Sequence, residues 1–151
     1  MSGQGTELTA YCGLYCGDCI RYRSKAADLA RDLRRELQNV GFDKYAEVKS
    51  LFVKELLHYG ECCRVLEAIS ELQCNTGCRY GGCPTFSHKI VECCQTRGLE
   101  GCWECDEFEK CKEFEFLEPF HGDTPLRNLR KIKELGLDKW VEHRYKFYQW
   151  L

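Results

Sequence analysis

Thirteen cysteines dominate the chemistry available to this 151-residue chain. They form five groups along the sequence: Cys12-x3-Cys16-x2-Cys19, Cys62-Cys63, Cys74-x3-Cys78-x4-Cys83, Cys93-Cys94 and Cys102-x2-Cys105-x5-Cys111. A two-residue spacer lets the backbone turn around an ion so that both thiolates reach it at about 2.3 Å. The first and last groups contain this spacer, and glycines beside the first group supply a tight backbone. We therefore interpret these groups as knuckles that bind metal.

Disulfide bonding is the main alternative use for so many cysteines. An odd number of cysteines would leave one thiol without a partner in a complete disulfide set. Residues 1–10 show no basic patch followed by an apolar core, and no apolar run approaches the roughly 20 residues that span a bilayer. We therefore expect a cytoplasmic protein that contacts no membrane, in a compartment where thiols stay reduced and disulfides are rare.

The thirteen cysteines are not equivalent. Cys62 lies on an apolar helical stripe, where a free cysteine acts as a small hydrophobic residue, and we interpret both Cys62 and Cys63 as packing residues. At most one of Cys93 and Cys94 is expected to bind metal, and helical spacing does not choose between them. His88 offers an imidazole nitrogen nearby, although a single histidine is more often a surface or core residue.

The elements that carry these cysteines are predicted to be helical. Apolar residues at Ala26, Ala30, Leu33 and Leu37 recur at spacings of four and three, which places them on one helical face. Caps, glycines and apolar spacing predict helices over 24–40, 43–60, 61–73, 86–96 and 124–136, with a further helix beginning at Asp138. No segment alternates apolar and polar residues in steps of two. We predict a mainly α fold, a single small helical domain over 1–151 with cysteine-knuckle metal sites and a C-terminal helical hairpin over 124–151.

Several segments resemble the cysteine-rich bacterial and archaeal family called domain of unknown function 3795. They are YCGLYCGDC at 11–19, GCR at 77–79, KIVECC at 89–94, GCWECDEF at 101–108 and NLRKIKELGLDKW at 128–140. The resemblance covers most of the chain in the same order. It implies a soluble cysteine-rich protein that binds metal, and it implies no established activity.

The resemblance also implies a set of ligands. Its motif assigns nine cysteines: Cys12, Cys16, Cys19, Cys74, Cys78, Cys93, Cys102, Cys105 and Cys111. Family members often have a cysteine just before the Lys-Ile pair, where this chain has His88, so the tenth ligand is either His88 or Cys83. Ten ligands fill two four-coordinate sites with two to spare, or share ligands in a cluster, and the sequence does not tell which cysteines pair. We expect about two Zn²⁺ ions per chain.

The leading functional hypothesis is a zinc-stabilised binding or adaptor module without catalysis of its own. Closed four-thiolate sites are structural, and no protease triad, phosphate-binding glycine loop or metalloprotease motif occurs. The alternative is a [4Fe–4S] protein, for electron transfer or radical chemistry. The first cysteine group has the spacing of radical S-adenosylmethionine enzymes, but Asp18 stands where those enzymes carry an aromatic residue.

Thiol redox chemistry at Cys102 and Cys105 is a third hypothesis, which the surrounding carboxylates disfavour because they raise the pKa of a thiol. Residues 100–118 contain eight acidic residues and two lysines, although the whole chain has a net charge of only −2. Because phosphate contacts need a basic surface, we do not expect nucleic acid to bind there. A protein partner of unknown identity remains compatible with the sequence.

Overall fold

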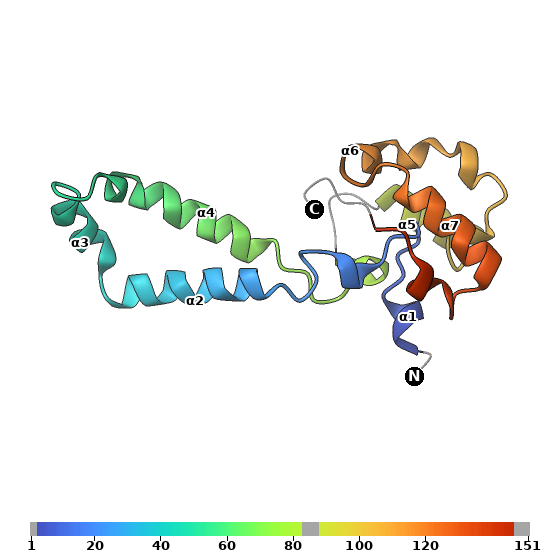
Figure 1. The fold of residues 1–151 in the computed structure, drawn as a ribbon, viewed down its shortest axis with the longest axis horizontal. Helices are drawn as coiled ribbons and strands as arrows, with labels where there is room; N and C mark the ends of the chain where they lie inside the picture. The colour runs from blue at the N-terminus through green and yellow to red at the C-terminus, as the bar shows by residue number, and fades with distance from the viewer. Residues whose placement is uncertain (1–2, 83–87, 147–151) are drawn as a thin grey trace. The chain divides into compact units, whose positions relative to one another are not determined.

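The computed structural model describes residues 3–82 and 88–146, and this part of the chain is mainly helical (Figure 1). Its α-helices are α1 (Gly3–Glu7), α2 (Lys25–Asn39), α3 (Phe42–Lys49), α4 (Tyr59–Glu71), α5 (His88–Arg97), α6 (Glu118–His121) and α7 (Thr124–Leu135). Short 3-10 turns join them: η1 (Cys16–Asp18), η2 (Lys54–His58), η3 (Cys78–Tyr80), η4 (Cys102–Glu104), η5 (Phe108–Lys110), η6 (Lys112–Leu117) and η7 (Trp140–His143). Within these ranges the extended backbone forms one isolated bridge, between Thr9 and Tyr15, and no strand. The prediction of a mainly α fold is confirmed.

The chain divides into two compact units. The core unit comprises residues 1–22 and 76–151, and the hairpin unit comprises residues 23–75. The prediction of a single domain over 1–151 stays a prediction, and the two units are described separately below.

The hairpin unit contains the long helices α2 and α4, which pack along each other in opposite directions (Figure 1). The Ser24 side chain accepts a hydrogen bond from the backbone N–H of Ala27 at 3.3 Å, which caps the start of α2. At the other end, Gly41 follows the helix with a left-handed φ of 62°. Both boundaries agree with the predicted helix over 24–40.

The helix predicted over 43–60 is wrong in its extent. Helix α3 ends at Lys49, and a separate turn precedes α4, so that Gly60 lies inside α4 instead of ending a helix. The Ser50 hydroxyl donates to the backbone carbonyl of Glu47 at 2.7 Å, a local bond that competes with helix continuation. The backbone then becomes extended at Val53, with φ −120° and ψ 93°.

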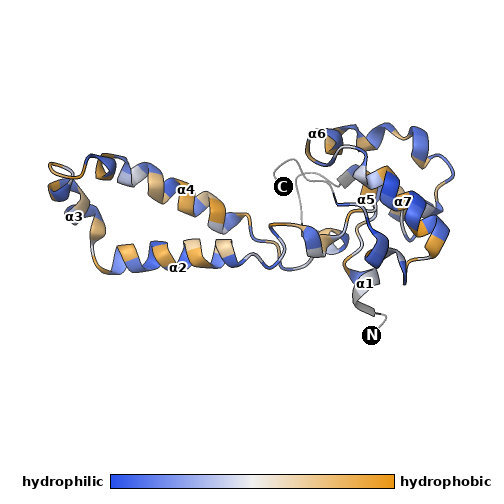
Figure 2. Cartoon of the chain, in the orientation of Figure 1, coloured by the Kyte–Doolittle hydropathy of each residue, from blue (hydrophilic) through white to orange (hydrophobic). Residues whose placement is uncertain are grey.

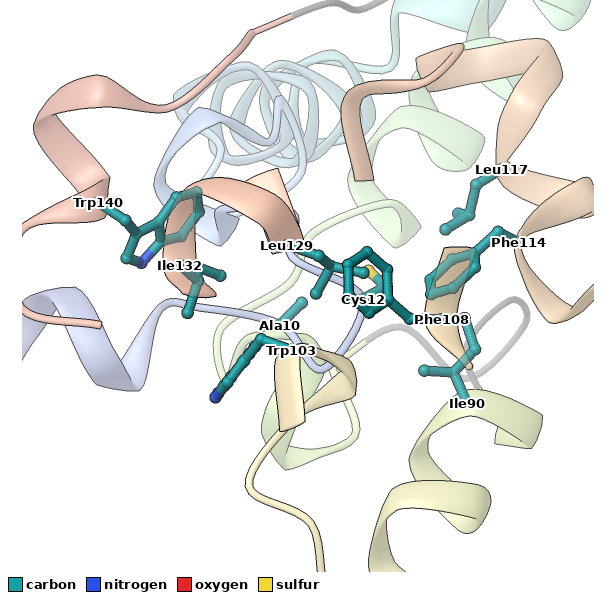
Figure 3. Close-up of a cluster of buried hydrophobic side chains, with 10 residues drawn as sticks. All are labelled: Ala10, Cys12, Ile90, Trp103, Phe108, Phe114, Leu117, Leu129, Ile132 and Trp140. Carbon is teal, nitrogen blue, oxygen red and sulfur yellow. The ribbon is translucent and has the colours of Figure 1, made fainter. Parts of the chain in front are cut away.

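The core unit is organised around fully buried side chains of its C-terminal half. Leu129 and Trp140 are 0% exposed, and Cys12 lies next to Leu129 at the centre of the cluster (Figure 3). Gly13 has a φ of 81° and is buried so closely against α7 that an added Cβ would lie 3.0 Å from both Leu129 and the Pro125 carbonyl. Only glycine suits both the left-handed backbone and this approach, so the first knuckle is seated directly on α7.

The C-terminal segment differs from the predicted helical hairpin. Helix α7 ends at Gly136 as predicted, but the described residues that follow, up to residue 146, form only the turn η7. The indole N–H of buried Trp140 donates to the Thr9 hydroxyl at 3.3 Å. The Asn128 side chain bonds both the N–H and the carbonyl of Tyr145, at 2.7 and 3.2 Å. These tertiary bonds fix the segment around the turn η7, where a second helix was predicted.

A largely buried ion pair attaches this C-terminal segment to the first knuckle. Arg144 donates two hydrogen bonds to the carboxylate of Asp18, at 2.5 and 2.7 Å, and Lys146 lies 3.3 Å from the same group. The side chains of Asp18 and Arg144 are 12% and 17% exposed. Burial by itself raises the pKa of Asp18, but the bonds and charges of Arg144 and Lys146 outweigh it and lower this pKa below its ordinary value.

We expect Asp18→Asn to lower the free energy of unfolding by about 1–3 kcal/mol, because Arg144 would lose a charged acceptor in a poorly solvated position. The control is Glu109→Gln, which alters a pair with Arg130 that has the same two-bond geometry but side chains 42% and 54% exposed. That change should stay within about 0.5 kcal/mol, because solvent screens an exposed pair. Urea denaturation of both variants at matched metal content measures the difference. Equal losses in the two would contradict the importance of burial.

Candidate metal centre

The two Cys-x2-Cys segments fold into the same turn. In η1 the N–H of Cys19 donates to the carbonyl of Cys16 at 3.0 Å, and in η4 the N–H of Cys105 donates to the carbonyl of Cys102 at 3.1 Å. The closing cysteines share one backbone conformation, with φ and ψ of −78° and 126° at Cys19 and −84° and 128° at Cys105. Side chains three residues apart lie on the same side of a 3-10 turn, so each knuckle presents its two thiols together.

The first set of cysteines lines a cavity of about 230 Å³ in the core unit. Its members are Cys12, Cys16, Cys19 and Cys78. Cys12 and Cys16 are buried, and the backbone N–H of Cys78 donates to the Cys16 sulfur at 3.2 Å. This bond brings together knuckles that are 62 residues apart in sequence. The remaining lining is mainly apolar and includes Ile90 and Leu117.

The second set lines a separate cavity of about 580 Å³. It consists of Cys93 and Cys94 on α5, Cys102 and Cys105 at η4, and Cys111 after η5. The sulfurs of Cys94 and Cys102 are 3.6 Å apart. Four thiolates placed tetrahedrally at about 2.3 Å from one zinc ion are separated by about 3.8 Å, so this pair already has the spacing of two ligands of one ion.

Helix α5 makes its two adjacent cysteines different. Cys94 is 1% exposed and faces the core with Ile90, whereas Cys93 is exposed. The family resemblance assigned Cys93 as the ligand, and the spacing from Ile90 left both open. The rotation of α5 is set by the packing of Ile90 into the core cluster, which no local sequence signal reports.

The remaining predicted ligands do not belong to either set in the part of the chain that the structure describes. Cys74 is buried in the hairpin unit, where its carbonyl accepts from the N–H of Arg23 at 2.8 Å. Cys83 lies outside the described residues, and so does the side chain of His88, the first residue of α5. Of the two predicted packing residues, Cys63 is half-buried and Cys62 is exposed. The prediction that Cys62 is a packing residue is therefore wrong for the described residues, where its side chain is exposed.

Neither set is a finished coordination shell. Among residues 3–82 and 88–146, no three cysteine, histidine, aspartate or glutamate side chains are already arranged to hold a metal ion. The donor chemistry nevertheless fits a thiophilic metal, because five thiols line one cavity and two of their sulfurs are at ligand spacing.

Two arginines accompany the second set. The Arg97 guanidinium lies 3.1 Å from the Cys105 sulfur, and Arg79 lies over the rings of Tyr11 and Trp103 at 4.4 and 5.6 Å. The charges of both arginines lower the pKa of Cys94, after the larger effect of its hydrogen bond with Cys102. A zinc ion with four thiolates carries a net charge of −2, which nearby guanidinium groups offset.

The thiols of Cys94 and Cys102 are hydrogen-bonded to each other. Their hydrogen bond lowers the pKa of Cys94 and, together with burial, raises that of Cys102. Burial raises the pKa of Cys12 to about 12, and the charges of Cys16 and Cys94 both add to this rise. The pKa of Cys12 therefore depends on a cysteine of each set.

Comparison with known families identifies the chain. Residues 8–116 match the family described as "Protein of unknown function (DUF3795)", and the protein belongs to this family. The match includes all thirteen cysteines and the entire hairpin unit. Comparisons with curated proteins and with solved structures returned no match. In the described ranges, no helix combines the length and the apolar character that crossing a membrane requires.

The Cys94–Cys102 spacing predicts which disulfide forms first when metal-free protein is oxidised. Diamide accepts two electrons and two protons from a pair of thiols, and sulfurs 3.6 Å apart need little movement to reach bonding distance. We expect limited treatment to give mainly a Cys94–Cys102 crosslink, detected by peptide mass spectrometry. Predominant linkage of Cys102 to Cys105 would contradict this geometry and would favour the redox-pair hypothesis.

Proposed function

We propose that this protein binds zinc through cysteine thiolates and that the metal stabilises the core unit instead of performing catalysis. The observation that carries the proposal is the second cysteine set, with five thiols around one cavity and the Cys94 and Cys102 sulfurs 3.6 Å apart. Zinc is the metal that tetrahedral thiolate sites most often hold in proteins.

For this site we propose Cys94, Cys102, Cys105 and Cys111 as ligands. Cys94 is preferred to Cys93 because it is buried beside Cys102, whereas Cys93 is exposed. A second ion is proposed at the first set, formed by Cys12, Cys16, Cys19 and Cys78, which gives about two zinc ions per chain.

The positions of the ligands support a structural role. The second set joins α5, η4 and the end of η5, which are short elements with little regular hydrogen bonding between them. Four coordinate bonds would fix these segments around Trp103, Phe108 and Phe114, which form one side of the core cluster. A closed four-thiolate shell leaves no open position for substrate or water, so we propose a binding or adaptor module.

An iron–sulfur cluster is the second candidate because the cavity beside the second set, at about 580 Å³, is larger than a single ion needs. In a [4Fe–4S] cluster each cysteine binds a different iron atom, so neighbouring thiolates lie farther apart than two ligands of one ion. The 3.6 Å approach of Cys94 and Cys102 therefore favours zinc.

Elemental analysis of protein purified without oxygen tests the proposal directly. We expect about two zinc ions per chain and no absorbance near 400 nm, because zinc has a filled d shell. Stoichiometric iron with a brown colour would show that the sites hold an iron–sulfur cluster instead of zinc. The proposal that cysteine thiolates bind the metal would still stand. Substoichiometric metal of every kind, in protein that remains folded, would overturn metal binding itself.

Paired serine variants test the ligand set. Cys94→Ser should lose about one zinc ion and several kcal/mol of stability, because a hydroxyl is a poor zinc ligand and three thiolates would be left with an open shell. Cys93→Ser is the matched control at the adjacent position, and it should keep the full zinc content. Zinc is counted by mass spectrometry beside thermal melting. Loss in Cys93→Ser with retention in Cys94→Ser would reverse the assignment.

The same zinc measurement can be made on a second pair of variants, one in a knuckle and one in the hairpin unit. Cys105→Ser should lose metal as Cys94→Ser does, whereas Cys62→Ala should keep the full metal content because Cys62 is exposed on α4. Metal loss in Cys62→Ala would mean that the hairpin unit takes part in a site.

A further inference from the structure

The second set contains one thiol more than a zinc ion needs. Five cysteines line its cavity, whereas a tetrahedral thiolate site takes four ligands. The four ligands proposed above leave out Cys93. This thiol is exposed, while the other four of the set are buried or half-buried. The cysteine that zinc does not use is therefore also the one that solvent reaches most easily.

One guanidinium group lies next to both this thiol and a proposed ligand. Cys93 and Arg97 are four residues apart on α5, so their side chains are neighbours on the helix surface. The Arg97 side chain donates to the Cys105 sulfur at 3.1 Å. The hydrogen bond and charge of Cys105, followed by those of Cys93, raise the pKa of Arg97, which agrees with two sulfurs beside one cation. Cys93 and Cys105 therefore share Arg97 as a neighbour.

Cys94 follows Cys93 directly in the sequence but is poorly placed to bond with it. Consecutive Cα atoms are about 3.8 Å apart, whereas disulfide bonds usually join Cα atoms about 4.4–6.8 Å apart. Adjacent side chains on a helix also differ by a rotation of about 100°. Cys94 is 1% exposed and faces the core, so it points away from the exposed Cys93. These geometries favour Cys105 as the partner of Cys93.

We propose that Cys93 is an oxidation site through which hydrogen peroxide releases the zinc ion of the second set. The proposal rests on the zinc site of the proposed function and adds a means of regulating it. The Cys93 thiol reacts with peroxide to give a sulfenic acid and one water molecule. The Cys105 thiolate then attacks the Cys93 sulfur, and a disulfide bond forms as hydroxide leaves and takes up a proton. Peroxide thus accepts two electrons from the two sulfurs and becomes two water molecules.

The disulfide bond removes one ligand from the zinc shell. Zinc binds the thiolate form of cysteine, and Cys105 no longer has this form once its sulfur is bonded to Cys93. Three thiolates hold the ion less tightly than four, so zinc dissociates and the bonds that it makes between α5, η4 and the end of η5 are lost. A dithiol reductant would restore both thiols, which allows the site to be filled again.

Zinc itself determines which thiol reacts first. A ligand thiolate shares its electron pair with the metal, whereas Cys93 is uncoordinated and exposed, and oxidation of thiols follows exposure. In metal-free protein the nearest pair, Cys94 and Cys102, is expected to crosslink first because its sulfurs are 3.6 Å apart. The first disulfide should therefore change from Cys94–Cys102 to Cys93–Cys105 when zinc is bound.

An equimolar amount of hydrogen peroxide, added to the zinc-loaded full chain, tests the proposal. We expect release of about one zinc ion per chain, followed with a coloured chelator, and a Cys93–Cys105 crosslink in peptide mass spectrometry. Cys93→Ser should keep its zinc but slow the release at least about 10-fold, because the first thiol to react is missing. The matched control is Cys62→Ala, which should release zinc at the wild-type rate. Cys62 is exposed as Cys93 is, but it lies on α4 in the hairpin unit, where apolar and polar residues follow one another along the helix (Figure 2).

Counting zinc before peroxide is added separates this proposal from the proposed function. Zinc-loaded protein that releases the ion equally fast in Cys93→Ser, or that first forms Cys94–Cys102, would overturn the oxidation site and leave the zinc site standing. Wild-type protein without zinc at the second set would overturn both.

Alkylation of the wild-type protein keeps the proposal testable if Cys93→Ser fails to fold. An equimolar amount of iodoacetamide should modify Cys93 before the other four thiols of the set, without loss of zinc, and should then prevent release by peroxide. Modification of Cys105 before Cys93 in the loaded protein would contradict the proposal.

Discussion

The approach of the Cys94 and Cys102 sulfurs to 3.6 Å is the contact on which the proposed metal site depends. It requires α5 to turn Cys94 inward and η4 to present Cys102 from a turn that also carries Cys105. Thiols this close, buried at Cys94 and half-buried at Cys102, are suited to sharing an ion. The hydrogen bond between these two thiols also accounts for the opposite pKa shifts of the two cysteines.

Few large side chains form the rest of the core unit, and buried polar contacts connect its parts. Arg79 lies over Tyr11 and Trp103 and donates to the carbonyl of Thr9 at 3.0 Å, while the Thr9 hydroxyl accepts from Trp140. These bonds hold the N-terminal segment, η3, η4 and η7 together. The turns themselves contain little regular backbone hydrogen bonding. The proposed metal would therefore add further bonds between segments that these side-chain contacts already connect.

The two units differ in which side chains they bury. The core unit has fully buried side chains such as Leu129 and Trp140, together with two cysteine sets, whereas the hairpin unit has alanines inside and large apolar residues outside. Below about 70–80 residues, a single core seldom supplies enough stability without metal, disulfides or oligomerisation. The hairpin unit falls below this size, whereas the core unit exceeds it, so on grounds of size alone only the hairpin unit would need such support.

The sequence by itself determined the features that depend on neighbouring residues. The helical content, the cap at Ser24, the glycine ends at Gly41 and Gly136 and the two Cys-x2-Cys turns all follow from local chemistry, and the family resemblance rests on these motifs. Tertiary structure decided what needs distant partners. The rotation of α5 by Ile90 buries Cys94 instead of Cys93, and the bonds of Trp140 and Asn128 prevent the expected last helix, because such contacts join residues that local spacing does not relate.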